Sequence, residues 1–468
     1  MTTLAEAPAR SMPAADPKQF HLNAHAEFGA SAAGPDWLKD VRERAIRAFD
    51  TAGFPARKAE AFRYTNLRPV TGKSFRLATG ETVAARSLAS EFGFGEQAVA
   101  SVVMVDGKLD RELSDLDNLP AGFTVADLMD AAEGEDAAVI QQHLAQSADV
   151  EKHPFVALNT AFLGGGVFLK VDSDASCDEP IHVLSISTGQ TDGDENAIAY
   201  PRLLVVAGDR AKFAFVETFC GPEETTYVAC PVTEIVAGED CEIDHNKLNA
   251  EGRLGLHIAT METTIGARTK FVDHSCTIGS KLTRNDLNVH MNGEAADATL
   301  SGVVILSGSQ HCDNHTLLDH QYPNCPSFEL YKHVLDDEST GLFKGQIFVH
   351  QRAQKTDSKQ NSRTLLLSDT AAMNSQPALE IYADDVKCTH GSTTGPLDEG
   401  SIFYLNSRGV SGDMAKRLLT YAFAADVTRR IKVAPVRERV ESYMAKQHGL
   451  PTDFRIQELT GATEDVVF

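Results

Sequence analysis

The sequence lacks the cysteine patterns of zinc-binding and disulfide-rich proteins. It has eight cysteines in 468 residues, and none of them forms a Cys-x-x-Cys pair. Zinc-finger spacing and a dense disulfide framework are therefore excluded, and we expect free thiols in a reducing cytoplasm. The cysteines are scattered along the chain: Cys177, Cys220, Cys230, Cys241, Cys276, Cys312, Cys325 and Cys388.

Long apolar runs and an excess of positive charge are also missing. No run approaches the roughly 18 residues that a membrane span needs, and the N-terminus has no basic region followed by an apolar segment. The formal net charge is −23, which argues against binding to a phosphate backbone. We therefore expect a cytoplasmic protein that binds neither nucleic acid nor membrane.

Common catalytic signatures are absent as well. The chain has no Gly-x-Ser-x-Gly nucleophile elbow, no His-Glu-x-x-His helix and no phosphate-binding loop of the Gly-x4-Gly-Lys-Ser/Thr type. It therefore does not itself bind ATP in the P-loop manner. The acidic turn LDDEST (335–340) leaves open a sugar-cleaving hydrolase or lyase, although paired aspartates more often form solvated turns.

The first third of the chain predicts a tail followed by helices. Residues 1–34 are rich in Ala, Pro and Ser and show little periodicity, which predicts a mobile tail. Residues 35–163 predict a mainly helical domain. Its first helix, over 34–55, carries one apolar stripe and ends at Gly53 and Pro55.

Residues 164–405 alternate short β-rich runs with turns, ending with SIFYL (401–405). A glycine recurs in four of the turns, at steps of 30, 28 and 27 residues. A near-constant step of this size predicts stacked coils, whereas the turns of a sandwich come roughly every 8–12 residues. We therefore predict a β-solenoid, with turn glycines Gly208, Gly238, Gly266 and Gly293.

The end of the chain, over 406–468, predicts a small helical domain. Ser411 is the expected N-cap of its first helix, and a second helix is expected over 436–447. Residues 452–468 predict a loose tail. One face of the first helix carries the apolar residues Met414, Leu418 and Tyr421.

Histidines gather in the segment SGSQHCDNHTLLDH (307–320). The spacing of His311 and His315 suits a metal site on a helix, but on a strand these residues would lie roughly 13 Å apart. Both interpretations stay open, and hydrogen bonds to solenoid turns are favoured. Four other histidines recur along the coils and predict a polar ladder on one face: His245, His257, His274 and His290.

The segment DDVKCTHGSTTG (384–395) carries the most specific candidate site. On a strand, Cys388 and His390 would point to the same face. A thiolate beside an imidazolium would be an activated pair and a ligand for soft metals or sulfur. Two core residues without a function are the alternative interpretation.

Three long segments resemble one family. Residues 34–67, 311–350 and 352–411 closely resemble the SufB/SufD family of iron–sulfur cluster assembly proteins, through elements such as Trp-Leu, Gly-Phe-Pro and the DDVKCTHG stretch. The Cys-x-His-Gly form at 388–391 resembles the SufD branch. SufB-like chains carry His-Glu there and a cysteine after the Leu-Leu-Leu element, so a SufB-like paralogue is the alternative.

The resemblance implies a right-handed parallel β-helix between a helical N-terminal domain and a small C-terminal helical domain. It implies a non-catalytic scaffold of the SufBCD complex that binds SufB through the β-helix ends, while the partner SufC hydrolyses ATP. No cofactor is expected to stay bound to this chain alone. A transient iron–sulfur cluster would form at the SufB interface, with His390 as a metal ligand and Cys388 beside it. A homodimer in isolation is the alternative assembly.

The resemblance also implies that SufC docks on the C-terminal helices. The docking element would be the helix from Ser411 to Arg430 together with the turn before it. The residues expected to contact SufC are Ser407, Arg408, Gly409, Met414, Leu418 and Tyr421.

Overall fold

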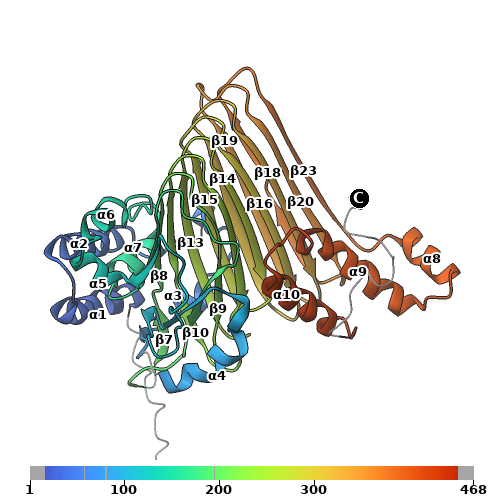
Figure 1. The fold of residues 1–468 in the computed structure, drawn as a ribbon. Coiled ribbons are helices and arrows are strands. Elements are labelled where there is room, and N and C mark those ends of the chain that lie inside the picture. Colours follow the sequence, from blue (N-terminus) through green and yellow to red (C-terminus); the bar gives the residue numbers. More distant parts are fainter. Residues whose placement is uncertain (1–15, 57, 80–81, 194, 452–468) are drawn as a thin grey trace, which may run out of the picture.

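A β-helix of about seven turns dominates the computed structural model, which describes residues 16–56, 58–79, 82–193 and 195–451. Figure 1 shows two long sheets that face each other, with helices grouped at the N-terminal end and along one side of the C-terminal half. Across the described residues, every helix is too short or too polar to span a membrane.

The first sheet has a long path and four short strands beside it. In spatial order the path is β21 (Ala372–Ser375), β19 (Thr340–Val349), β17 (His311–His320), β15 (Leu282–Met291), β13 (Leu256–Ile265), β11 (Val232–Ala237), β8 (Arg202–Ala207), β5 (Val167–Val171) and β4 (Phe123–Asp127). The short strands are β22 (Ala378–Ile381), β10 (Tyr227–Ala229), β7 (Asn196–Ala199) and β1 (Phe75–Leu77).

The second sheet faces the first across the interior. Its order is β23 (Lys387–Gly395), β20 (Asp357–Leu366), β18 (Pro326–Leu335), β16 (Asp297–Leu306), β14 (Lys270–Thr277), β12 (Glu242–Ala250), β9 (Lys212–Cys220), β6 (Ile181–Ile186), β2 (Ala100–Val105) and β3 (Lys108–Leu109). The named strands pair in parallel, except that β2 with β3 and β4 with β5 are antiparallel.

The spacing of the turn glycines is the length of a coil. In the second sheet, Lys212, Glu242, Lys270 and Asp297 are successive register partners, at steps of 30, 28 and 27 residues. Glycine lets the stacked turns approach closely, because a Cβ on Gly293 would lie 2.1 Å from the backbone nitrogen of the turn before it. The prediction of stacked coils is therefore confirmed.

The interior of the coils forms the main core. Alternate residues of each strand point inward, and in the middle coils these include Phe213, Phe215, Phe271 and Leu300, all nearly inaccessible to solvent. Burying each such side chain stabilises the fold by about 1.5–3 kcal/mol. Polar residues also point inward on the second sheet, such as His245 and Asp273 in the middle coils and Ser358 and Gln360 in the last coils.

The N-terminal helices are α1 (Pro17–Ser31), α2 (Asp36–Ala52), α3 (Arg68–Thr71), α4 (Thr82–Phe92), α5 (Leu128–Glu133), α6 (Ala137–His143) and α7 (Pro154–Ala161), with 3₁₀ turns at Glu60–Phe62 and Gly95–Gln97. The helix predicted over 34–55 is confirmed as α2, which ends at Gly53 and buries Leu38, Ala45 and Phe49.

One N-terminal prediction needs correction. The tail predicted for residues 1–34 is wrong for 17–31, which form α1. His21 of α1 is buried against Phe49 and Phe54, so tertiary contacts order a segment of weak periodicity; residues 1–15 lie outside the described residues. Strands β2 and β4 of the N-terminal part join the solenoid sheets.

The C-terminal helices are α8 (Glu399–Ser407), α9 (Gly412–Thr428) and α10 (Ala434–Gln447). Ser411 caps α9 as predicted, since its hydroxyl accepts the N–H of Met414 at 3.3 Å. The strand predicted at SIFYL is wrong: these residues lie in α8, whose first turn is capped by the Asp398 carboxylate. The tail predicted for 452–468 lies outside the described residues.

Helix α9 is fixed to the outer face of the second sheet. Lys332 of β18 donates to the carbonyl oxygen of Phe423 at 2.8 Å and pairs with Asp426 at 2.7 Å. Tyr421 packs among the apolar residues of the same contact. These contacts attach the C-terminal helices directly to the solenoid.

Candidate functional site: the uncapped end of the solenoid

The two ends of the solenoid differ. At the N-terminal end, Leu109, Leu116 and Leu119 pack over the interior. At the other end, β23 hydrogen-bonds only to β20, and β21 and β22 only to β19. No other strand of the described chain pairs with these edges, so the last coil presents unpaired backbone groups.

The free backbone groups of β23 can be assigned from its pairing. The N–H of Lys387 donates to the Thr356 carbonyl at 2.8 Å, on the side of β20. Because backbone groups alternate in direction along a strand, the N–H groups of residues 388, 390, 392 and 394 point away from β20. They are available to a further strand.

Cys388 and His390 lie at this end, on one face of β23, as the sequence predicted. Their register partners on β20 are Ser358 and Gln360, which are both buried and therefore face the interior. Cys388 is half-buried and packs against the main core, whereas His390 is exposed. The pair thus lines the open mouth of the solenoid.

The activated thiolate–imidazolium pair is not present in the chain by itself. Cys388 and His390 share no hydrogen bond, and burial raises the pKa of the Cys388 thiol. Within the described ranges, no group of three or more histidine, cysteine, aspartate or glutamate side chains is placed to hold a metal ion.

The histidine-rich segment 307–320 serves a structural purpose. His315 pairs with Asp313 at 3.1 Å, and His311 contacts the Thr65 hydroxyl at 3.0 Å. Asp313 also accepts from the buried guanidinium of Arg284 at 2.6 Å and from Thr65. The hydrogen bonds of His311 and His315 go to side chains rather than to solenoid turns as predicted, and they hold an N-terminal segment on the outer face of the first sheet.

The predicted ladder of His245, His257, His274 and His290 is wrong. The inward-facing register partner of His245 is Asp273, so His274 on β14 points to the opposite face. His257 and His290 lie in the other sheet. Each coil contributes strands to both sheets, so similar spacings can place residues on different faces. Burial opposes the charge of His245, but Asp273 and Glu217 outweigh it and raise its pKa to about 9.

The aspartates of the acidic turn at 335–340 accept hydrogen bonds from backbone N–H groups of the turns. Asp337 accepts the N–H of Gly308 in the coil before it at 2.8 Å, and Asp336 accepts the N–H of Asp337 at 2.8 Å. The prediction of turn-forming aspartates is confirmed for this pair.

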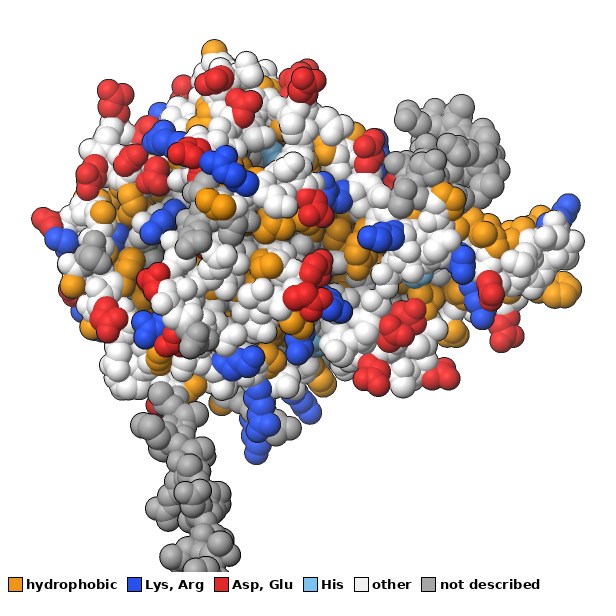
Figure 2. Space-filling model, turned by 90° about the horizontal axis from the view of Figure 1, so that it is seen from below, with side chains coloured by type: hydrophobic (Ala, Val, Ile, Leu, Met, Phe, Trp, Pro, Cys, Tyr) orange, Lys and Arg blue, Asp and Glu red, His pale blue; other side chains and the backbone are white. Residues whose placement is uncertain are grey.

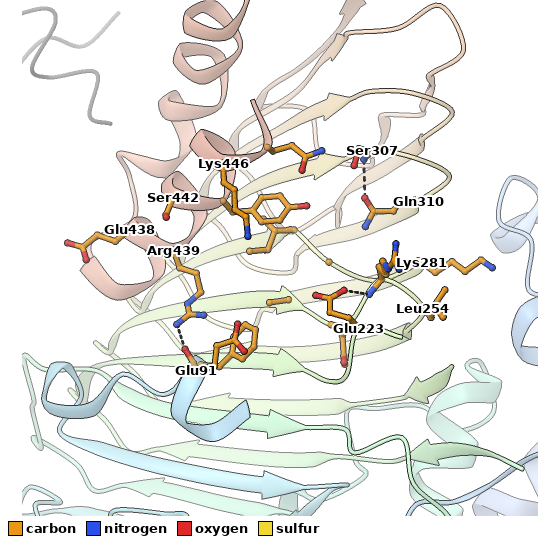
Figure 3. A pocket seen from close by; sticks show the side chains of 18 of the residues that line it. Glu91, Glu223, Leu254, Lys281, Ser307, Gln310, Glu438, Arg439, Ser442 and Lys446 are labelled. Carbon is orange, nitrogen blue, oxygen red and sulfur yellow. Dashed lines mark hydrogen bonds between the residues drawn. The ribbon is translucent and has the colours of Figure 1, made fainter. Parts of the chain in front are cut away.

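A large groove lies elsewhere on the molecule, between α4, the turns of the middle coils and α10 (Figure 3). Its volume is about 1300 Å³. Figure 3 shows Arg439 reaching toward Glu91. Its guanidinium donates a hydrogen bond of 2.6 Å to the backbone carbonyl oxygen of Glu91. Glutamates and cations are mixed along its walls, and none of its lining residues comes from β20 or β23. The groove is therefore separate from the site at Cys388 and His390.

Of the six residues predicted to contact an ATPase partner, five are exposed or half-buried and one is buried. Ser407 ends α8, and Arg408 and Gly409 lie in the turn that leads to α9, where Gly409 has a positive φ of 87°. Met414 is exposed at the start of α9, and Leu418 is half-buried.

Tyr421 was wrongly predicted to lie on a docking surface. It is 1% exposed, because the apolar stripe of α9 faces the solenoid rather than a partner.

The sequence analysis missed two exposed aromatic residues on α8. Phe403 is 74% exposed and Tyr404 is 58% exposed, and no residue of α8 is buried. Figure 2 shows hydrophobic side chains gathered on the arm that projects at the right, where α8 and the start of α9 lie. The apolar residues of SIFYL carried this signal, but the sequence analysis assigned the run to the β-rich solenoid.

Comparison with known proteins agrees with this architecture. Residues 189–423 match the family described as "SUF system FeS cluster assembly, SufBD core domain", and residues 22–183 match the "SufBD protein N-terminal region". The chain belongs to the SufBD family. The core match spans the solenoid from β7 through α8 and most of α9.

Relatives of this SufBD protein match it over most of their length. An iron–sulfur cluster assembly SufBD family protein of Synechocystis is 28% identical over 86% of this chain and 89% of its own. The assembly protein SufD of Escherichia coli is 28% identical, covering 83% and 88%. SufD of Bacillus subtilis is 23% identical, covering 88% and 94%. The chain is therefore a SufD-like iron–sulfur cluster assembly protein.

Proposed function

We propose that this SufD-like chain is a scaffold subunit of a SufBCD-type complex, without catalytic activity of its own. It binds a SufB-like chain through the uncapped end of the solenoid and a SufC-like ATPase through the C-terminal helices. A nascent iron–sulfur cluster is the cargo of the complex, and His390 supplies one of its ligands.

The observation that carries the proposal is the uncapped end itself. A solenoid needs a cap or a partner at each end, since an open coil exposes interior groups and strand edges. Here the open end combines free backbone N–H groups on β23 with Ile381 and Tyr382, which are 38% and 60% exposed beside the edge of β22. A strand added by a second chain would bond the free groups and cover the apolar residues.

The same end supports the proposed ligand role. Because Cys388 and His390 alone cannot complete a metal site, ligands from both sides of an interface would meet at this mouth. The described cysteines are all free thiols, which suits a reducing compartment, and the cytoplasmic location stays a prediction.

The projecting arm supports the proposed ATPase contact. Helix α8 follows β23 after three residues and exposes Phe403 and Tyr404, with Arg408 stacked 5.3 Å from the ring centre of Tyr404. Exposed aromatic and arginine side chains of this kind are typical centres of protein interfaces. A movement of the ATPase would therefore reach β23 directly.

A proline in β23 tests the proposed interface. Ser392 is exposed, and its N–H points to the free edge, so Ser392→Pro removes that donor without breaking a bond to β20. We expect binding to the SufB-like partner to weaken by at least ~10-fold, because the ring blocks strand addition. Size-exclusion chromatography with light scattering on the mixed chains measures the loss.

The matched control is Ser392→Ala, which keeps the backbone N–H and should bind as the wild type does. An unchanged melting temperature would show that Ser392→Pro is folded. Equal binding by the proline and alanine variants would contradict an interface at this edge. If the chain also dimerises by itself and the proline abolishes that dimer, the same edge pairs with a second copy.

A further inference from the structure

The inward face of the second sheet carries polar residues up to the open end. Glu329 on β18, Gln360 on β20 and His390 on β23 are successive register partners. Glu329 is completely buried, Gln360 is 1% exposed and His390 is exposed at the mouth. The three side chains therefore form a row that leads from the interior to the proposed cluster site.

The amide of Gln360 is held on one side only. Its Nε2 donates to Oε2 of Glu329 at 2.6 Å. Gly345, across the interior, leaves space for this amide, because a Cβ there would lie 2.3 Å from Nε2. The Oε1 atom of Gln360 is buried and has no hydrogen-bond partner among the described residues. Buried carbonyl oxygens nearly always accept a hydrogen bond, so this atom calls for a donor.

His390 is the residue in register to supply that donor. Neighbouring strands lie about 4.8 Å apart, and a neutral imidazole carries one N–H donor and one free lone pair. The exposed ring makes no hydrogen bond with another described residue, so it is free to rotate toward the amide. We propose that Gln360 accepts the ring N–H of His390, fixes its tautomer and leaves the other ring nitrogen free to bind the cluster.

Glu329 and Gln360 are therefore positioning residues for His390, and this inference rests on the proposed ligand role. Histidine ligands of metals usually donate their second ring N–H to a carbonyl or carboxylate, which sets the orientation of the ring. The carboxylate of Glu329 holds the NH₂ end of the amide, so the carbonyl end is left for His390. Without that carboxylate, the amide can turn over and present a donor instead.

The test is the tautomer of His390 in the full chain. Histidine labelled with ¹⁵N is observed by long-range ¹H–¹⁵N NMR at pH 8, where an ordinary imidazole is neutral. The His390 signals are identified by their loss in His390→Gln. We expect one dominant tautomer in the wild type, and a mixture of both in Gln360→Leu and in Glu329→Gln. The control Asn361→Leu changes the next residue of β20, on the outer face, and should leave the spectrum unchanged.

Cluster assembly in the reconstituted complex gives the second readout. Loss of a partner that orients a metal ligand typically costs about 10–100-fold in affinity or activity, and we expect Gln360→Leu to fall in this range. If both variants keep the wild-type tautomer, the inference is wrong while the ligand role stands. If the tautomer shifts but His390→Ala still assembles clusters normally, the ligand role is wrong and only the hydrogen bond remains. Glu329→Gln preserves the size of the side chain, so this variant provides the test if Gln360→Leu does not fold.

Discussion

Replacing His390 with alanine is expected to lower iron–sulfur cluster assembly by at least ~10-fold while the complex still forms. The side chain is exposed and makes no hydrogen bond with another described residue, so its loss should not affect folding. Removing the imidazole, however, removes the ligand that we propose for this chain at the solenoid mouth. The measurement is the iron and sulfide content of the reconstituted complex, followed by its visible absorption.

The control for His390→Ala is Thr389→Ala, the neighbouring residue on the outer face of β23, which should assemble clusters normally. Cys388→Ala separates the roles of the two candidate residues. Its thiol is half-buried with a raised pKa, so we expect a smaller loss than for His390→Ala. Normal cluster content in His390→Ala would show that the ligands come from elsewhere.

Replacing Phe403 and Tyr404 together with serine is expected to abolish stable binding of the SufC-like ATPase. Both side chains are exposed on a helix that buries none of its own residues. Aromatic residues at the centre of an interface contribute about 2 kcal/mol or more each, so the loss of both should lower the affinity by roughly 700-fold. Titration calorimetry with the isolated ATPase subunit measures this change directly.

The control for the α8 variant is Val83→Ser on α4, which replaces an 80% exposed apolar residue at a distant place in the chain. It should bind the ATPase as the wild type does. The double variant should keep its binding to the SufB-like partner, because β23 is unchanged. Wild-type affinity for the ATPase in the double variant would place the contact on another surface.

The coiled architecture could be predicted from the sequence because it depends on local spacing. Turn glycines recur once a coil, so the steps between Gly208, Gly238, Gly266 and Gly293 give the coil length directly. The common face of Cys388 and His390 follows in the same way from the two-residue period of a strand.

The elements that the sequence analysis got wrong depend on contacts between distant residues. Helix α1 has little periodicity, and its position is set by contacts of His21 with Phe49 and Phe54. The run SIFYL suits a strand or a helix equally. The run forms a helix because the Asp398 side chain caps its first turn and the solenoid has ended before it.

The surroundings of the candidate site could not be predicted from local sequence patterns either. The apolar stripe of α9 was interpreted as a docking face, but Tyr421 packs on the solenoid. The row formed by Glu329, Gln360 and His390 requires the register of three strands whose coils differ in length. A single sequence gives the average coil length and leaves this register open.

Hydrogen–deuterium exchange of this chain, alone and mixed with its SufB-like partner, tests the central claim most directly. If the uncapped end is the interface, the free amides of residues 388, 390, 392 and 394 on β23 and those of the β21–β22 edge should exchange fast in the free chain and become protected in the complex. The groove lined by Arg439 should exchange alike in both states. Unchanged exchange at β23, with protection appearing elsewhere on the chain, would contradict the proposed site.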